Sequence, residues 1–215
     1  MTTSSIDFEK YLKSKKVNLD YLSIYKNSIR NSYELSNNIS VFDKLLDERI
    51  IFLGEIDDTS TELVKANILY LDSISDEDIS IYINSGGGSV YSGLGLLDVM
   101  DYVKSDIITV NTGLAASMAA VVLCSGTNGK RKSLKRSRTM IHQPLTYGGW
   151  MQQASDVEIE AKEMNHLKKE LYKIISEKTG QPYDKVYKDG DRDYWMSAQD
   201  AKKYGMIDEI ITKRK

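Results

Sequence analysis

The sequence predicts a mixed α/β fold in which short strands alternate with helices from about residue 41 to residue 215. Two observations lead to this prediction. Short runs rich in Ile, Val and other apolar residues recur along the chain, and patterns typical of helices lie between them. With 215 residues, of which 41% are hydrophobic and 28% charged, the chain can bury one full core and has the composition of a globular protein.

Residues 1–40 differ from the rest of the chain. They are rich in Ser, Asn, Lys and Tyr, and residues 31–40 show neither helical nor strand periodicity. We expect a polar N-terminal arm here, with one short helix near residues 7–14. Charged residues interrupt the start of the sequence, so a secretory signal peptide is not expected. The folded domain is expected over residues 41–215.

The first strand of the domain is predicted over residues 49–54, where the β-rich run RIIFLG ends in a glycine. Thr59 and Glu62 have the spacing of a capping box, which predicts an amphipathic helix that continues to residue 74. A second strand is predicted over residues 78–85, the run DISIYINS.

Glycines at 86–88 predict a tight passage from this strand into a helix over residues 89–104. A third strand is predicted over residues 106–113. We expect Gly113 to let the chain turn there into a helix of small residues over 115–124. Two later strands are predicted from the apolar runs at residues 138–143 and 206–212.

One helix is predicted to be unusually long. Ser155 and Glu158 have the spacing of a capping box, and Gly180 followed by Pro182 is a typical stop signal. About 24 helical residues span roughly 36 Å, which is longer than a small domain needs. Its apolar residues fall close to a heptad stripe. We expect the helix to project and bury this stripe against another subunit, although an ordinary packing helix is the alternative.

Ser117, in the run GLAASMAA, is a candidate nucleophile. It lies near the predicted start of a helix, where free N–H groups and the helix dipole favour a developing negative charge. The run lacks the G-x-S-x-G pattern of the α/β-hydrolases, and a buried helix cap would explain the same serine.

A serine nucleophile needs a base and an acid that orients the base. His142 ends an apolar run and is the better candidate base, because His166 lies within the predicted long helix among charged residues. Three acids follow in KDGDRDYWMS, namely Asp189, Asp191 and Asp193, and the pattern alone does not choose among them. A charged turn before a helix capped by Ser197 is the alternative explanation.

Charge and cysteine content exclude several function classes. Lys and Arg (29) nearly balance Asp and Glu (31), so the net charge of −2 predicts no general attraction to nucleic acid or acidic membranes. The basic run over residues 130–138 has no interleaved aromatic residue and is expected to be a solvated loop. A single cysteine, Cys124, excludes a cysteine-rich metal site. The longest apolar stretch, residues 114–124, is too short to cross a membrane.

The glycine-rich run NSGGGSV is the last candidate element. Three glycines after a strand allow close approach of the backbone to a ligand and can expose an N–H group to an oxyanion or a phosphate. The chain has no G-x-x-x-x-G-K-[ST] sequence, so ATP binding by a P-loop is not expected.

Taken together, these segments resemble the family of ClpP, the proteolytic subunit of the Clp protease, a serine peptidase family with a crotonase-like fold. The motifs occur in the family's order between about residues 41 and 211: DERIIFLG, INSGGGSVYSGLGLLDVM, GLAASMAA, MIHQPL and DRDYWMSAQDAKKYGMIDEI. Each motif is weak alone, and together they are specific. The resemblance implies a crotonase-like spiral of β-β-α units with a projecting handle helix.

The resemblance also implies roles for individual residues. The family's nucleophile falls on Ser117, its base on His142 and its acid on Asp193, directly before an aromatic pair expected to pack into the body of the domain. The amides of the family's oxyanion hole fall on Gly88 and Met118. No cofactor or metal is implied.

Other positions concern assembly. Asp191 and Arg192 match a pair that, in the family, links neighbouring rings to the alignment of the active site. Residues 146–180 match the handle, which joins two seven-membered rings into a hollow barrel. The chain departs from the family at Gly86, where Pro is usual, and at Leu114, where Gln is common.

The implied function is that of a serine endopeptidase subunit of a barrel-shaped Clp protease in the bacterial cytoplasm. It would form a homo-oligomer of two stacked heptameric rings and cleave unfolded polypeptides delivered by an AAA+ ATPase unfoldase of the ClpX, ClpA or ClpC type. Two alternatives remain open: a catalytically weak or non-catalytic ring subunit of a mixed Clp complex, and a crotonase-fold enzyme acting on acyl-CoA. The joint presence of a serine, a histidine and an acid in the family's order argues against both.

Overall fold

The computed structural model describes residues 40–145 and 153–213. The predicted arm, up to residue 39, and its helix near residues 7–14 lie outside the described residues. The elements are, in chain order, α3 (Val41–Asp47), β1 (Ile50–Leu53), α4 (Asp58–Ile74), β2 (Ile79–Ser85), α5 (Val90–Tyr102), β3 (Ile107–Ala116), α6 (Met118–Cys124), β4 (Arg131–Leu134), β5 (Arg138–Ile141), α7 (Ala154–Thr179), α8 (Tyr183–Asp189), β6 (Tyr194–Ser197), α9 (Ala198–Tyr204) and β7 (Glu209–Ile211).

The chain divides into two compact units, residues 1–51 and 52–215. In the described part of the first unit, α3 begins with a capping box. The hydroxyl of Ser40 accepts from the amide of Asp43, and the carboxylate of Asp43 accepts from the amide of Ser40.

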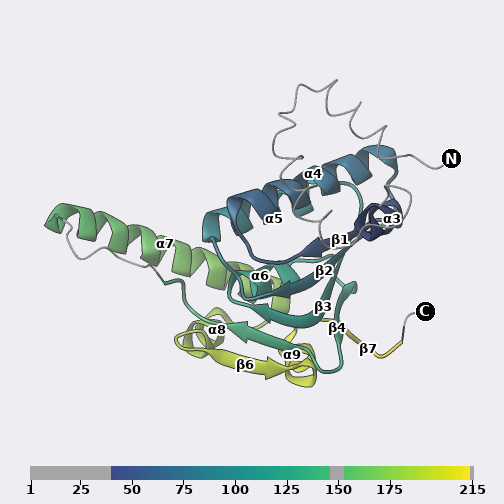
Figure 1. The fold of residues 1–215 in the computed structure, drawn as a ribbon. Helices are drawn as coiled ribbons and strands as arrows, with labels where there is room; N and C mark the ends of the chain where they lie inside the picture. Colours follow the sequence, from purple (N-terminus) through teal and green to yellow (C-terminus); the bar gives the residue numbers. More distant parts are fainter. Residues whose placement is uncertain (1–39, 146–152, 214–215) are drawn as a thin grey trace. The chain divides into compact units, whose positions relative to one another are not determined.

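The strands form one sheet in the order β1-β2-β3-β4-β7, and β5 pairs with both β3 and β6 (Figure 1). Pairing is parallel throughout β2-β3-β4-β7 and between β3 and β5, whereas β5 and β6 are antiparallel. The predicted α/β class and the crotonase-like fold are confirmed. Strand β3 is central because its first half pairs with β4 and its last three residues pair with β5.

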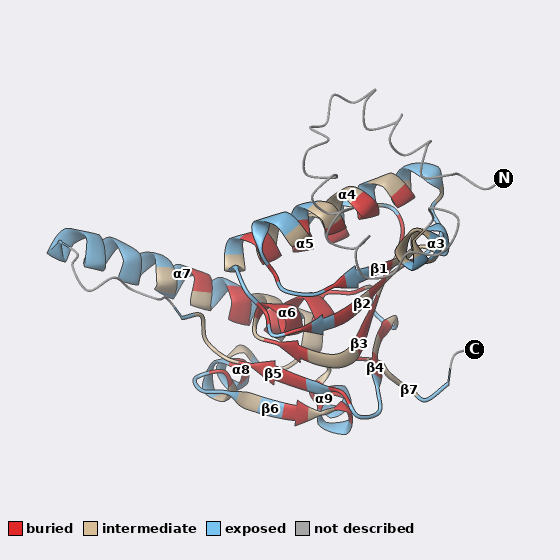
Figure 2. Cartoon of the chain, in the orientation of Figure 1, coloured by how far each residue is buried: buried red, intermediate tan, exposed pale blue. Residues whose placement is uncertain are grey.

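Helix α6 occupies the middle of the core. All seven of its residues are buried, and it packs against β2, β3 and β5 as well as α5 and α7 (Figure 2). The small residues that the sequence shows here, Ala119 and Ala120, have no exposed surface. Close approach of so many elements is possible because these side chains occupy little volume.

The predicted start of helix α4 is wrong. Helix α4 is capped by Asp57, whose carboxylate accepts from the amide of Ser60, so the helix begins before Thr59 and contains Glu62. An Asp two residues upstream can satisfy the free amides of the first turn, and the helix starts there. The prediction that Ser197 caps a helix is confirmed, with Asp200 completing the capping box.

The long helix is confirmed as α7, with 26 residues. The predicted cap at Ser155 is wrong, because the residue before the helix is Gln153 and its side chain makes no capping bond. Gly180 ends the helix in a left-handed conformation, as expected. Of the predicted handle, residues 146–152 lie outside the described residues.

Helix α7 has two different halves (Figure 2). Its C-terminal half is part of the core, with Leu167, Leu171 and Ile175 buried. Its N-terminal half extends beyond the sheet, and Val157 and Ile159 are 49% and 66% exposed there. The predicted apolar stripe is therefore shared between the subunit's own core and a free surface.

The predicted solvated loop over residues 130–138 is wrong in part. Residues Arg131–Leu134 form β4 between β3 and β7. Arg131 is 5% exposed, and its guanidinium forms an ion pair with Asp208 and donates to the carbonyls of Cys124 and Lys178. The arginine thus satisfies carbonyls at the ends of α6 and α7, which no further helical amide can reach.

Candidate active site

Ser117 forms the one-residue turn between β3 and α6. Its φ and ψ of 57° and −128° are rare for a residue with a side chain. Three backbone bonds hold it in place: its amide donates to the carbonyl of Met140 at 2.9 Å, and its carbonyl accepts from the amides of Ala120 and Val121 at 2.9 and 3.4 Å. The geometry is that of a strained strand-to-helix turn that exposes a nucleophile, although the G-x-S-x-G pattern is absent.

The expected turn at Gly113 is wrong, because β3 continues through Ala116. Gly113 is needed for a different reason. A Cβ at this position would lie 2.7 Å from Oδ1 of Asn84, whose side chain accepts from the amide of Leu114. Residues 115 and 116, expected in the helix, instead end the strand directly before Ser117.

His142 lies directly after β5, beside Ser117. Ala116 of β3 pairs with Met140 of β5, so Ser117 and His142 both follow the ends of adjacent parallel strands. The Nε2 atom of His142 is 2.8 Å from Oγ of Ser117, and the imidazole is 17% exposed.

Asp193 lies on the other side of the imidazole. Ile141 of β5 pairs with Tyr194 of the antiparallel strand β6, which places the next residue of one strand, His142, opposite the preceding residue of the other, Asp193. Oδ1 of Asp193 is 3.1 Å from Nδ1 of His142. An ionised carboxylate only accepts, so Nδ1 carries the proton and Nε2 is free to accept from the hydroxyl of Ser117.

The other two candidate acids have other partners. Asp189 accepts from the hydroxyl of Tyr204 at 3.0 Å and pairs with Lys185. The carbonyl of Asp191 accepts from Nε2 of Gln143 at 2.8 Å, and its carboxylate is 3.8 Å from Nζ of Lys168.

Lys168 was not a candidate in the sequence, yet it also donates to Oε1 of Gln143 at 3.0 Å. It therefore connects α7 to the residue after His142 and to the turn that carries Asp193. Arg192 is exposed on that same turn. A lysine in a charged helix gives no sequence signal for such a role.

The expectation that the aromatic pair after Asp193 packs into the body is wrong for Trp195, which is 47% exposed. The turn is held by backbone pairing instead, because Tyr194 and Trp195 pair with Ile141 and Met140 of β5. On a strand, successive side chains point to opposite faces, and the face that carries the Trp195 ring is exposed.

The glycine loop lies against Ser117. A Cβ on Gly87, whose φ is 102°, would be 2.7 Å from Cβ of Ser117 and 3.1 Å from the amide nitrogen of Met118. Gly88, with φ of 144°, passes so close to Ile56 that a Cβ would lie 2.1 Å from the Ile56 carbonyl oxygen. Both positions accept glycine alone.

The directions of two amides follow from the bonds around them. The carbonyl of Gly87 accepts from the amide of Ile56 at 2.9 Å, and the N–H of Gly88, in the same trans peptide, therefore points away from Ile56. The carbonyl of Ser117 points into α6, so the N–H of Met118 points out of the N-terminal end of that helix. The N–H groups of Gly88 and Met118 are therefore both free of these backbone bonds, one pointing away from Ile56 and the other out of the N-terminal end of α6.

A small apolar cavity of about 20 Å³ adjoins the serine and the histidine. Its wall is formed by Val90, Ser117, Met118, Val121, Ile141, His142, Pro144, Leu171 and Ile175. A larger polar cavity of about 460 Å³ lies elsewhere, around Arg131 and the C-terminal ends of α5, α6 and α7.

His166 is 68% exposed on α7 and lies 3.4 Å from Glu170, as expected of a solvent-facing residue. Within residues 40–145 and 153–213, no cluster of three or more His, Cys, Asp or Glu side chains could hold a metal ion. In the same part of the chain, no helix is long and apolar enough to cross a membrane.

Comparison with known proteins identifies close similarities over most of the chain. The family model described as Clp protease matches residues 33–214. The ATP-dependent Clp protease proteolytic subunit of Bacteroides fragilis is 56% identical over 178 residues, which cover 82% of this chain and 85% of that protein. The protein of the same name from Porphyromonas gingivalis is 55% identical, with 82% and 80% covered. The ATP-dependent Clp protease proteolytic subunit 2 of Parasynechococcus marenigrum is 52% identical, with 81% and 88% covered.

Proposed function

The chain belongs to the Clp protease family and is a serine peptidase, the proteolytic subunit of such a protease, and we propose that Ser117, His142 and Asp193 carry its chemistry. The observation that carries the proposal is the continuous contact from Oγ of Ser117 to Nε2 of His142 and from Nδ1 of His142 to Asp193. Nucleophile, base and orienting acid are the three parts that serine catalysis needs.

In the acylation step, Oγ of Ser117 attacks the peptide carbonyl while Nε2 of His142 takes the hydroxyl proton. Asp193 holds the proton on Nδ1 and stabilises the imidazolium. The imidazolium then gives its proton to the leaving amine, and an acyl-enzyme remains. In deacylation, His142 takes a proton from water, the resulting hydroxide attacks the ester, and the serine is regenerated.

The negative oxygen of both tetrahedral intermediates is stabilised by the amides of Gly88 and Met118. Support comes from the directions of these two N–H groups and from the contact of Gly87 with Ser117. The Met118 amide is also the first of α6, where the helix dipole favours negative charge.

The substrate is an unfolded polypeptide that binds as an extended strand beside the glycine loop, so that backbone bonds give most of its affinity. The side chain before the scissile bond lies next to the apolar residues beside Ser117, and this apolar surface favours apolar side chains there.

The working assembly is two stacked rings of seven identical subunits, fed by an AAA+ ATPase unfoldase in the bacterial cytoplasm. The relatives that match this chain carry "ATP-dependent" in their names, and those reported above are bacterial. On the free half of α7, Val157 and Ile159 are exposed on opposite sides of the helix, and their exposure supports a contact of this half with a facing ring. Asp191 and Arg192 link that contact to the site, through the bonds of Gln143 and Lys168 to the same turn.

The test is covalent labelling with a fluorophosphonate, followed by peptide mapping of the modified residue. Modification at Ser117, lost in His142→Ala and in Ser117→Ala, is expected. The unsubstituted protein should also hydrolyse a short unstructured peptide without nucleotide. Labelling at another serine, or undiminished hydrolysis by Ser117→Ala, would overturn the assignment.

A further inference from the structure

The glycine loop that carries the Gly88 amide has little stiffness of its own. Three consecutive glycines lose more conformational freedom on ordering than any other residues would, and two of them have positive φ. A preorganised oxyanion donor requires that this loop be held by its surroundings. The hydroxyl of Ser85 accepts from the amide of Gly87 at 3.0 Å at the start of the loop. Two further restraints act beside Gly88, one from the backbone and one from side chains.

The backbone restraint is a single bridge to the segment between β1 and α4. Ile56 donates to the carbonyl of Gly87 at 2.9 Å and accepts from the amide of Ser89 at 2.7 Å. The bridge fixes the loop at one point, and the chain then continues from Ile56 directly into the first turn of α4.

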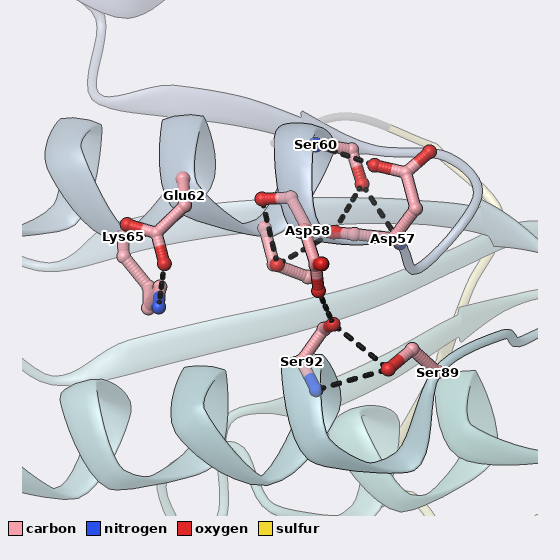
Figure 3. Close-up of polar contacts among 8 residues, drawn as sticks. Asp57, Asp58, Ser60, Glu62, Lys65, Ser89 and Ser92 are labelled. Carbon is pink, nitrogen blue, oxygen red and sulfur yellow. Dashed lines mark hydrogen bonds and ion pairs between the residues drawn. The ribbon is translucent and has the colours of Figure 1, made fainter.

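The side-chain restraint starts from that same turn, at Asp58 (Figure 3). The hydroxyl of Ser92, on α5, lies 2.5 Å from Oδ1 of Asp58 and 2.9 Å from the hydroxyl of Ser89. The hydroxyl of Ser89 in turn lies 3.3 Å from the amide of Ser92, as the N-cap of α5.

The direction of every bond in this group follows from chemistry. A carboxylate only accepts, so Ser92 gives its hydroxyl proton to Asp58, and Ser89 gives its proton to the oxygen of Ser92. The oxygen of Ser89 then accepts from the amide of Ser92. The acceptor oxygen of Asp58 thereby fixes the rotamer of Ser89, the residue next to Gly88.

We propose that Asp58, Ser92 and Ser89 form a hydroxyl relay that positions the Gly88 amide for the oxyanion. This inference rests on the proposed function, in which Gly88 is an oxyanion donor. None of the three side chains needs to touch the substrate, so they are positioning residues. Their effect is on the transition state, because the oxyanion exists there and not in the bound peptide.

The test compares Asp58→Ala and Ser92→Ala with Glu62→Ala, the matched control. Glu62 also lies on α4 and pairs with Lys65, away from the relay (Figure 3). Four quantities are measured: kcat and KM for a short peptide, the inhibition constant of a peptide aldehyde, and that of the matching alcohol. The aldehyde forms a tetrahedral adduct with an oxyanion, and the alcohol does not.

We expect kcat to fall about five- to ten-fold in both relay variants, as for a lost hydrogen bond, with KM changed less than about two-fold. The aldehyde should bind more weakly by the same factor, and the alcohol unchanged. Because both changes break one relay, the double variant should be no worse than either single variant. Asp58→Asn, which keeps an acceptor for Ser92, should recover most of the loss.

The relay is refuted if kcat is unchanged in both variants, if aldehyde and alcohol weaken together, or if Glu62→Ala has the same effect. An altered native mass that accounts for the loss of activity would also refute it. Ser117→Ala, measured alongside, separates this result from the proposed function. If Ser117→Ala is inactive and the relay variants are normal, the relay alone is wrong.

Discussion

Replacing Asp193 by Asn should nearly abolish peptide hydrolysis while leaving the fold intact. Asn presents an N–H group to Nδ1 of His142, which then accepts and leaves its proton on Nε2. That proton points at Oγ of Ser117, only 2.8 Å away, and the imidazole can no longer act as a base. In a well-studied serine protease this change costs about 10⁴ in turnover, which corresponds to about 5.5 kcal/mol of barrier.

The exposure of Asp193 makes the comparison with alanine informative. Its side chain is 59% exposed, so water can reach Nδ1 when the carboxylate is removed. Water accepts from Nδ1–H and keeps the productive tautomer, whereas Asn enforces the wrong one. We therefore expect Asp193→Ala to keep more activity than Asp193→Asn.

The assay is the steady-state hydrolysis of a fluorogenic peptide, with labelling by a fluorophosphonate to count active serines and native mass to verify assembly. Asp184→Asn, on the exposed first turn of α8, is the control for loss of one nearby charge. If Asp193→Asn kept more than about a tenth of the activity while Asp189→Asn lost it, the acid would be misassigned. If alanine were worse than asparagine, the tautomer argument would be wrong.

Three further predictions follow from the same geometry. Gly87→Ala should abolish hydrolysis, because its Cβ would clash with the nucleophile, whereas Gly86→Ala, with open space around its Cβ, should be nearly neutral in the same peptide assay. Burial alone would raise the pKa of Asp208, but hydrogen bonds from Arg131 outweigh burial and hold this pKa below its usual value. The stability that the ionised carboxylate confers is present above about pH 3.9 and is lost as the pH falls through the lowered pKa. Asp208→Asn should therefore flatten that part of a plot of unfolding free energy against pH. Ile159→Glu should shift the native mass toward smaller assemblies without changing the melting temperature of the subunit, since this side chain is 66% exposed; an unchanged mass would argue against a contact there.

The sequence by itself determined the type and order of most elements. Alternating apolar runs and glycines predicted β2, the glycine loop and α5, because periodicity and backbone freedom are local properties. The long helix was predicted for the same reason, and Gly180 ended it where expected. The N-cap of α4 was misplaced, because neighbouring polar residues compete for the same few amides, and Ser155, the predicted N-cap of α7, lies inside that helix.

The sequence also limited the candidate site to one serine, two histidines and three acids. Few residues could serve, since the chain has only two histidines. Ordinary periodicity could not choose among Asp189, Asp191 and Asp193, and a resemblance of motifs was needed to favour the last.

Tertiary structure decided what depends on register between distant strands. Pairing of Ile141 with Tyr194 brings Asp193 to His142 across 51 residues of sequence, and pairing of Ala116 with Met140 brings His142 to Ser117. Register is set by the packing of the whole sheet, and a shift of one residue would turn each side chain to the opposite face. Arg131 looks like a surface charge in the sequence, but the same long-range packing makes it a buried partner of Asp208. A buried charge is stable only where the fold supplies its counter-ion and hydrogen-bond acceptors.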